Sequence, residues 1–428
     1  MWHISRRCFL AGALAAAAPF RATARAVSAP SFAARDFIES IGVNTHLSSE
    51  PYVSRFPIVS RLVADLGTRH FRDELRPSND LSRWSELFDK HGVRSNLLVS
   101  PSTNTVADMN TYIGKLGREK ISAIEGQNEG NSDWFMAQES AQGNWARTVI
   151  EYQREVFDAV RQRYGEALPV ISPSVINWKP ADMKLLRDAA PFCDYVAIHS
   201  YPQGAQEPET DADYAALSWY LKMLRDPFKP DAPVMSTEAG YNNIVKPGGS
   251  GVSEKASSIY LLRMLLNNYA HGVERTFLYQ LLDSGDDPKE WEHHFGLVRH
   301  DDTPKPVFVA IANLIHALNV TKSESSARSP NVTLYNAVKS ARLVPLTHDD
   351  GTLTAAVWRA ERSWNVEKAI DIDVAPEPVI FNADQPLDRV QFVVPNEGRD
   401  WQDVTIQNGQ FVISTADKIV LVRVTPRV

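Results

Sequence analysis

The chain has 428 residues, of which 43% are hydrophobic and 23% are charged. A chain of this length and composition can form one large α/β domain and a smaller one, and the balance excludes disordered and collagen-like proteins. The formal net charge is −7 and no long run of lysine or arginine occurs, which argues against nucleic acid and anionic membranes as partners.

The first 26 residues predict an export signal. Arg6 and Arg7 resemble the bacterial twin-arginine motif, an alanine-rich stretch too short to span a bilayer follows, and a small-residue cleavage site ends at Ala26. We therefore expect a periplasmic or secreted protein without a membrane span. Removal of this segment takes the formal charge to −11 and leaves Cys193 as the one cysteine, so we expect no intramolecular disulfide.

From about residue 40 to residue 318, short β-prone runs alternate with amphipathic stretches, as in βα units around a parallel sheet. The eight expected strands are Ile41–His46, Arg69–Arg72, Arg94–Val99, Ala123–Gln127, Val170–Ser174, Tyr195–His199, Val234–Thr237 and Arg275–Tyr279. The expected helices include Arg55–Leu66, Trp84–His91, Ala107–Leu116, Trp145–Tyr164, Tyr214–Arg225, Ser253–Tyr269 and Val307–Leu318. Eight alternations over roughly 280 residues fit a (β/α)8 TIM barrel better than a doubly wound sheet. No glycine-rich nucleotide loop follows any strand, and we expect no cofactor.

After about residue 330 the pattern changes to short alternating runs separated by turns. The Asp350-Gly351 turn and the period-two alternation predict an antiparallel β-sandwich. The runs lie at residues 332–335, 349–358, 379–381, 390–394, 404–406, 411–413 and 418–423. We therefore expect an α/β protein with a barrel over residues 32–320, followed by a C-terminal antiparallel β-sandwich domain over residues 330–428.

Two glutamates close apolar runs in the barrel region: Glu129 at the end of the fourth run and Glu238 at the end of the seventh. Active sites of TIM barrels lie at the carboxyl ends of the strands, so both carboxylates are expected at the barrel mouth. Glycoside hydrolysis uses such a pair. The Asn-Glu dipeptide alone is a weak signal, because a second copy, Asn396-Glu397, falls in an expected turn.

With Asn128 before Glu129, the constellation resembles the clan A glycoside hydrolases, most closely in layout family 39 and next family 5. The resemblance implies a retaining enzyme in which Glu129 is the acid/base and Glu238 the nucleophile. It extends to Arg72 at the end of the second strand and to His199 and Tyr201 at the end of the sixth. It covers most of residues 40–318, as short motifs.

These residue types also suit the reaction physically. Glu238 must be ionised to attack a sugar, and a cationic Arg72 and a phenol donor from Tyr201 favour the anion. Glu129 must hold a proton and later act as a base. Asn128 suits a hydrogen bond to the sugar 2-hydroxyl. Two structural alternatives remain open: Arg72 as a surface arginine paired with a neighbouring acid, and His199 as a hydrogen-bonded barrel residue.

Aromatic side chains near the expected strand ends are candidates for stacking on sugar rings. The candidates are Trp178 after the fifth strand, Tyr279 on the eighth and Trp291 beyond it, each with simple packing as the alternative. Trp219 lies within a helical pattern and is expected in the core. The adjacent His293 and His294 lack the spacing of a zinc site, and we expect no metal.

The expected substrate is thus a carbohydrate with β-type linkages, cleaved by double displacement, with an endo-acting exopolysaccharide hydrolase as one form of the enzyme. The alternatives are an exo-acting enzyme resembling β-xylosidases and arabinosidases, and a non-catalytic carbohydrate-binding protein on the same barrel. A metal-dependent hydrolase is a weaker third option, because no ligand cluster stands at the strand ends. The sequence leaves open the sugar, the role of the sandwich and the oligomeric state.

Overall fold

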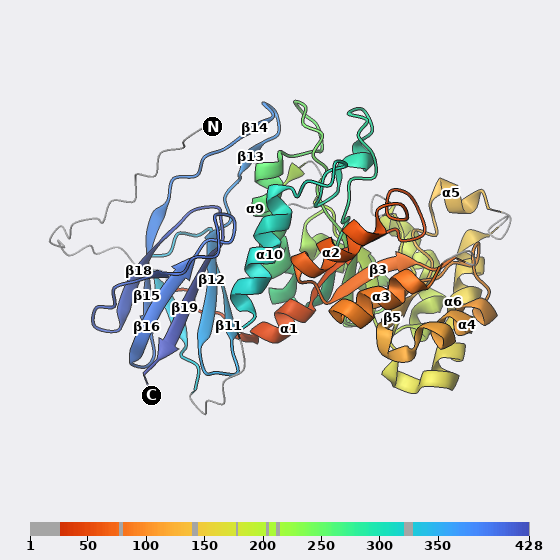
Figure 1. Cartoon of the computed structure of the whole chain (residues 1–428), viewed down its shortest axis with the longest axis horizontal. Helices are drawn as coiled ribbons and strands as arrows, with labels where there is room; N and C mark the ends of the chain where they lie inside the picture. Colours follow the sequence, from red (N-terminus) through yellow and green to blue (C-terminus); the bar gives the residue numbers. More distant parts are fainter. Residues whose placement is uncertain are drawn as a thin grey trace.

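The computed structural model describes residues 26–76, 80–138, 144–176, 179–202, 205–210, 215–320 and 328–427. The predicted export signal, residues 1–26, lies outside them except for its last residue. The described residues form a barrel and a β-sandwich side by side (Figure 1), which confirms the expected fold class. No helix among them is long and apolar enough to cross a membrane.

Eight parallel strands form the barrel, in the order β6-β5-β4-β3-β2-β9-β8-β7. A single bridge between Ile171 and Tyr195 joins β6 to β7 and closes the ring. All eight expected strands are present, displaced by a few residues at their ends. They are β2 (Ile41–Asn44), β3 (His70–Glu74), β4 (Arg94–Leu98), β5 (Ile121–Glu125), β6 (Val170–Ile171), β7 (Val196–His199), β8 (Val234–Ala239) and β9 (Val273–Leu278).

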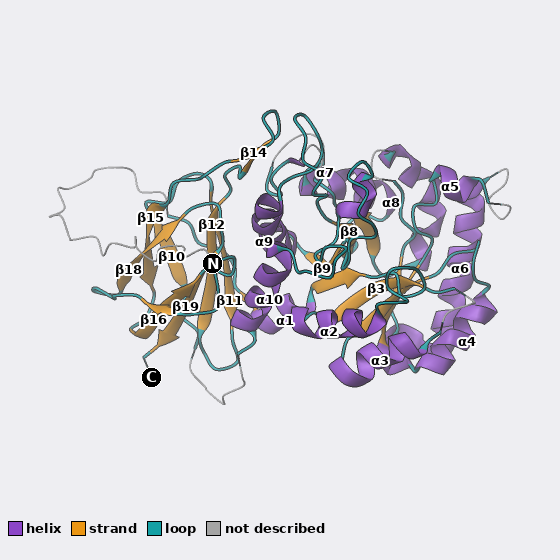
Figure 2. Cartoon of the chain, turned by 45° about the horizontal axis from the view of Figure 1, so that its top comes forward, coloured by secondary structure: helices purple, strands orange, loops and turns teal. Residues whose placement is uncertain are grey.

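Helices surround this sheet (Figure 2). The α-helices are α1 (Ala34–Glu39), α2 (Phe56–Leu66), α3 (Ser82–His91), α4 (Val106–Leu116), α5 (Asp133–Met136), α6 (Trp145–Tyr164), α7 (Leu217–Tyr220), α8 (Asp226–Phe228), α9 (Glu254–Ala270) and α10 (Pro306–Leu318). Shorter or differently wound helices are η1 (Arg118–Lys120), η3 (Gly165–Ala167), η4 (Pro180–Phe192), η6 (Leu221–Arg225) and η7 (Trp291–His294). Helices α2 and α3 end at Gly67 and Gly92, whose φ values of 80° and 69° are left-handed and favour glycine.

The sandwich packs a six-stranded sheet, β1-β11-β12-β19-β16-β17, on a three-stranded sheet, β10-β15-β18, with a hairpin β13-β14 beside them. Hydrophobic side chains of both sheets share one core. The strands are β1 (Phe32–Ala33), β10 (Val332–Tyr335), β11 (Ala341–Thr347), β12 (Leu353–Arg359), β13 (Trp364–Asn365), β14 (Ile370–Asp371), β15 (Glu377–Ala383), β16 (Leu387–Val393), β17 (Gln402–Asp403), β18 (Gln410–Thr415) and β19 (Val420–Pro426). The run at residues 404–406 is irregular, since the strand there ends at Asp403.

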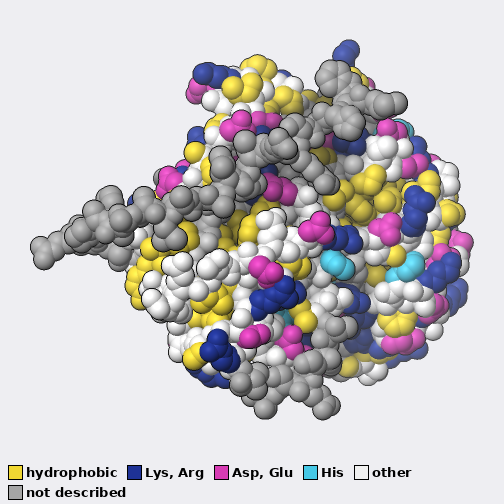
Figure 3. Space-filling view, turned by 60° about the vertical axis from the view of Figure 1, so that its left-hand side comes forward, with side chains coloured by type: hydrophobic (Ala, Val, Ile, Leu, Met, Phe, Trp, Pro, Cys, Tyr) yellow, Lys and Arg dark blue, Asp and Glu magenta, His cyan; other side chains and the backbone are white. Residues whose placement is uncertain are grey.

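Helices α1, α9 and α10 lie at the junction between barrel and sandwich (Figure 1). In α9 every residue from Ala256 to Asn268 is buried, because the barrel covers one side of the helix and the sandwich another. On the exposed face in Figure 3, lysine and arginine lie among aspartate and glutamate, and the described residues gather into no large basic patch there.

Candidate active site

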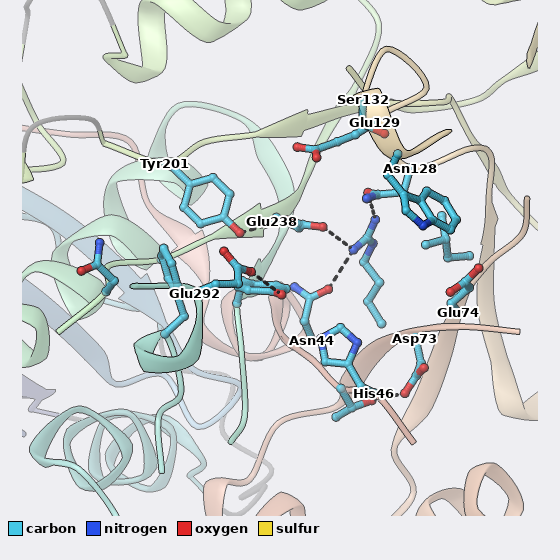
Figure 4. A pocket seen from close by; sticks show the side chains of 18 of the residues that line it. Asn44, His46, Asp73, Glu74, Asn128, Glu129, Ser132, Tyr201, Glu238 and Glu292 are labelled. Atoms are coloured by element: carbon cyan, nitrogen blue, oxygen red, sulfur yellow. Dashed lines mark hydrogen bonds and ion pairs between the residues drawn. The ribbon is translucent and has the colours of Figure 1, made fainter. Parts of the chain in front are cut away.

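A cavity of about 680 Å³ opens at the carboxyl ends of the barrel strands. Side chains from β3, from the segment after β5, from β8 and from the loop after β9 line it (Figure 4). Glu129 and Glu238 both face this cavity, as do Arg72, Asn128 and Tyr201. His199 lies directly beneath them at the end of β7, so the structure brings these six predicted residues together.

Glu238 stands near the end of β8, a strand that is buried along its whole length. Its Oε1 lies 2.9 Å from Arg72 Nη1, and its Oε2 accepts a hydrogen bond of 2.8 Å from the Tyr201 hydroxyl. Burial alone raises the pKa of a carboxyl group, but the charges of His199 and Arg72 and the donated hydrogen bonds outweigh it and hold the pKa of Glu238 below its usual range. The carboxyl is therefore held as the anion.

Arg72 is buried and holds four residues in place. Its Nε and Nη2 bind both oxygens of Glu125 at 2.8 and 2.9 Å, Nη1 binds Asn44 at 2.9 Å, and Nη2 binds Asn128 at 2.8 Å. Asn44 and Arg72 are direct partners in the register of β2 and β3. Burial lowers the pKa of a guanidinium group, yet the charges of Glu125 and Glu238 raise that of Arg72 above its usual range. The surface alternative for Arg72 is therefore wrong.

Glu129 lies four residues beyond the end of β5 and has a positive φ of 43°. A non-glycine residue in this region needs support from its surroundings, and the Glu129 backbone N–H donates a 2.9 Å hydrogen bond to Ser174 Oγ. Its side chain is 28% exposed, against 11% for Glu238. The turn thus directs the carboxylate to the open side of the cavity.

His199 joins the two carboxylates. It is the register partner of Glu238 in β7 and β8, and its Nδ1 lies 3.0 Å from Glu129 Oε1 and 3.7 Å from Glu238 Oε2. Because both distances are measured from one nitrogen, the separation of these two oxygens cannot exceed their sum, about 6.7 Å. Burial lowers the pKa of an imidazole, but the charge of Glu238 and the hydrogen bond to Glu129 outweigh it and raise the pKa of His199.

Two of the three predicted stacking residues line the cavity. Trp291 is 49% exposed and packs edge-on against Phe295, whereas Tyr279 donates a 2.8 Å hydrogen bond to Glu292 Oε1. The third, Trp178, lies outside the described residues. Trp219, expected in the core, is partly buried against one of the core clusters.

The cavity lining also includes residues that were not among the predicted site residues, and Asn44, His46, Trp134 and Glu292 are four of them. Asn44 ends β2 and His46 follows it, so the rule that polar residues at barrel strand ends face the mouth applies to both. Trp134 lies on the short helix α5 and Glu292 on η7, and elements of four residues are too short to carry a periodic signal in the sequence. In the part of the chain that the structure covers, no group of three or more His, Cys, Asp or Glu residues is arranged to hold a metal ion.

The sequence matches no protein-family model and no curated protein. The fold is similar to that of a family 39 glycoside hydrolase from the gut symbiont Bacteroides cellulosilyticus WH2, with a TM-score of 0.59 and 16% identity over 93% of this chain and 83% of that one. A glucosidase from Croceicoccus marinus has a TM-score of 0.57 and 12% identity, with 86% of this chain and 92% of that one covered. An endo-β1,6-glucanase has a TM-score of 0.51 and 9% identity, with 94% of this chain and 93% of that one covered. The chain shares its fold with these glycosidases, as its strand pattern predicts.

Proposed function

We propose that this protein is a retaining glycoside hydrolase that cleaves β-type linkages, with Glu238 as the nucleophile and Glu129 as the general acid and base. The observation that carries the proposal is the position of His199 Nδ1 within 3.0 Å of one carboxylate and 3.7 Å of the other. Two carboxylates at one barrel mouth, held in unlike environments, match the two roles that double displacement requires.

The surroundings of Glu238 suit a nucleophile. Arg72 and the Tyr201 hydroxyl hold its two oxygens, so the anion is oriented before a sugar binds. Burial and the charge of Glu238 raise the pKa of Tyr201 well above its usual value, so the phenol stays protonated and donates. In the first step Glu238 attacks the anomeric carbon and the glycosidic bond breaks, leaving a glycosyl ester on the protein.

The surroundings of Glu129 suit a proton carrier. Its carboxyl is the more exposed of the two, and within the described residues its one charged neighbour within an ion-pair distance is His199. Glu129 protonates the leaving oxygen in the first step and takes a proton from the attacking water in the second. Asn128 Oδ1 is occupied by Arg72, which leaves its amide N–H group to donate to the sugar 2-hydroxyl.

The positions of the two carboxylates are compatible with retention of configuration. Retaining enzymes hold the two groups about 5–5.5 Å apart, whereas inverting enzymes leave about 6.5–9.5 Å for a water molecule. Glu129 Oε1 and Glu238 Oε2 are at most about 6.7 Å apart, and this limit on one pair of oxygens admits the spacing of a retaining enzyme.

The rim of the cavity favours endo action on a polysaccharide. Trp134 follows β5 and Trp291 follows β9, and the two strands lie on opposite sides of the eight-stranded ring. Both side chains are exposed, at 58% and 49%. Aromatic faces on opposite edges of the mouth suit a chain of sugars that crosses it. An exo-acting enzyme and a non-catalytic binding protein remain the alternatives. From the twin-arginine pattern we infer that the protein is exported.

Hydrolysis assays on aryl β-glycosides and polysaccharides test the proposal. Glu238→Ala should abolish turnover. Glu129→Ala should retain slow cleavage of substrates with good leaving groups, and azide should restore its turnover, because azide needs no general base. Glu397 is the matched control, since it belongs to the second Asn-Glu pair and binds Lys418 at the surface. Glu397→Ala should keep full activity.

Trapping adds a direct readout. A 2-deoxy-2-fluoro glycoside with a good leaving group should label the wild-type chain, and peptide mass spectrometry should place the sugar on Glu238. A product of inverted configuration, or a label on another residue, contradicts the assignment. Sugar binding without turnover on any substrate supports the binding-protein alternative instead.

A further inference from the structure

The cavity carries more negative than positive side chains. Among the described residues that line it, five have carboxyl groups and two have guanidinium groups. Both guanidinium groups are already engaged: Arg72 with Glu125 and Glu238, and Arg76 with Glu74 at 2.6 Å. No lysine of the described chain lines the cavity. An acidic sugar would therefore meet carboxylates and no available cation, so uronic acids are poor candidates for the substrate.

Glu292 is one of three carboxyl groups in this cavity that the proposed reaction does not use. Of the other two, Asp73 accepts hydrogen bonds from Thr45 and Leu47, and Glu74 pairs with Arg76. Glu292 lies on η7, in the connection after β9, and Figure 4 shows it on the same side of the cavity as Tyr201, pointing toward Glu238. Its Oε1 accepts the Tyr279 hydrogen bond, and among the described residues no cation lies within ion-pair distance of it. One oxygen of a partly buried carboxylate is thus left to the cavity.

The electrostatic surroundings of Glu292 are unfavourable for a lone anion. Burial raises the pKa of Glu292, and the charges of Glu238 and Glu129 raise it further against the hydrogen bond from Tyr279. A hydroxyl or an amide of a sugar can be bound by neutral Asn, Gln or Ser side chains, which avoids the cost of burying an anion beside other carboxylates. A positive group bound beside Glu292 would offset the repulsion from its neighbours.

We propose that the substrate is a polysaccharide containing hexosamine units with free amino groups, and that Glu292 recognises the ammonium group of one of these units. The inference rests on the proposed hydrolase function and names its substrate class. Trp291, next to Glu292 in sequence and exposed at the rim, provides an aromatic surface that attracts cations as well as sugar rings. N-acetylation removes the charge and enlarges the group, so the acetylated polymer binds more weakly.

Binding measured on a protein that does not turn over tests this directly. In a Glu238→Gln background, calorimetry compares oligosaccharides of β-linked glucosamine and galactosamine with the corresponding N-acetylated oligosaccharides. We expect at least one of the free-amine series to bind about tenfold or more tightly than its acetylated counterpart, and this preference to shrink with added salt. Glu292→Gln should remove the preference and leave binding of the acetylated series unchanged.

Glu290→Gln is the matched control. Glu290 lies on the same loop and is exposed, and its removal changes the net charge equally without altering the cavity lining. It should keep the preference for free amines. Equal binding of free-amine and acetylated series overturns the inference, and so does a Glu292→Gln variant that weakens both series alike.

The outcome is separable from the test of the hydrolase. If the wild type cleaves neutral aryl β-glycosides but shows no preference for free amines, the substrate inference fails and the proposed reaction stands. If nothing is cleaved and no label reaches Glu238, the reaction fails. The binding comparison still decides whether Glu292 recognises an amine, because it needs no turnover.

Discussion

Arg72 Nη1 lies 2.9 Å from Glu238 Oε1, and both side chains are almost fully withdrawn from solvent. The same guanidinium group binds both oxygens of Glu125, which is completely buried. A buried cation between two carboxylates fixes the position of Glu238 and favours its ionised form. Glu125 is thus the residue that holds Arg72 in place for Glu238.

Replacing Arg72 should change both the pKa of Glu238 and the stability of the protein. Arg72→Met removes a positive charge that lowers the pKa of Glu238, so the acid limb of the kcat/KM profile should move to higher pH. The variant also leaves Glu125 as a buried unpaired charge, and stability should fall by about 3–5 kcal/mol. Urea unfolding and pH-rate profiles measure the two effects.

The double variant Arg72→Met with Glu125→Gln is the control for this prediction. It no longer contains the unpaired Glu125 charge, so most of the lost stability should return. The acid limb should stay at the higher pH and activity near neutral pH should stay below that of the wild type, because Glu238 still lacks the Arg72 charge. Recovery of activity together with stability would mean that Arg72 acts only on the fold.

His199 gives a second prediction, with a sign set by its raised pKa. A histidine whose pKa is higher in the folded than in the unfolded state contributes stability that is complete below about pH 6.5 and is lost as the pH rises through the folded value. The difference in melting temperature between the wild type and His199→Gln should therefore be larger at pH 6 than at pH 9. Turnover should fall about a hundredfold, because the two carboxylates lose their common partner.

A stability difference that grows toward alkaline pH would contradict the assignment of His199 as a cation. His271 is a suitable control, since it is exposed after the end of α9, and among the described residues its Nδ1 contacts the backbone carbonyl of Asn267. The variant His271→Gln should leave the pH dependence of stability and the turnover nearly unchanged.

The central part of the site could be read from the sequence because its residues stand at strand ends. Parallel strands that close into a barrel bring their carboxyl ends to one mouth, so locating the strands was enough to bring together Arg72, His199 and Glu238. The strand boundaries needed to be right only within a few residues. The positions of these side chains follow from topology more than from any local motif.

Other features depend on contacts that no local pattern encodes. The partner of Glu125 could not be identified from the sequence, because Arg72 is 53 residues away in the chain. Strand β11 contains Pro345, which hides it from a strand pattern, and β1 pairs with it from the other end of the chain. The position of the Glu292 side chain follows from its hydrogen bond with the Tyr279 hydroxyl, which forms only in the folded chain.

The joint between barrel and sandwich gives a third prediction. Arg263 of α9 is fully buried and binds Glu209, which also accepts a 2.6 Å hydrogen bond from Trp358 Nε1 in the sandwich. Arg263 Nη1 binds the carbonyl of Glu361 at 2.8 Å. Arg263→Met should destabilise the protein by about 3–5 kcal/mol, because Glu209 remains as a buried unpaired charge. Urea unfolding followed by tryptophan fluorescence measures the loss.

A double-mutant cycle tests whether the pair acts as a unit. Arg263→Met combined with Glu209→Gln should cost clearly less than the two single losses added together. Strict additivity would show that the two side chains stabilise the joint independently.

Buried His70 gives the last prediction, and it concerns acid stability. The residue starts β3 at the amino end of the barrel strands. Its side chain has no exposed surface, and its Nε2 lies 3.1 Å from Glu39 Oε2. Burial lowers the pKa of His70 to about 4 despite the hydrogen bond with Glu39. A histidine whose pKa is lower in the folded state contributes stability above about pH 6.5 that is lost as the pH falls toward 4, because the unfolded chain takes up the proton first. The wild type should thus lose stability over this range by an amount on the order of 2–3 kcal/mol from this residue.

Urea unfolding at pH 7, 5.5 and 4 should show a smaller decrease for His70→Gln than for the wild type, even though the variant starts from a lower stability at pH 7. An equal decrease in both proteins would mean that His70 is already charged in the folded chain.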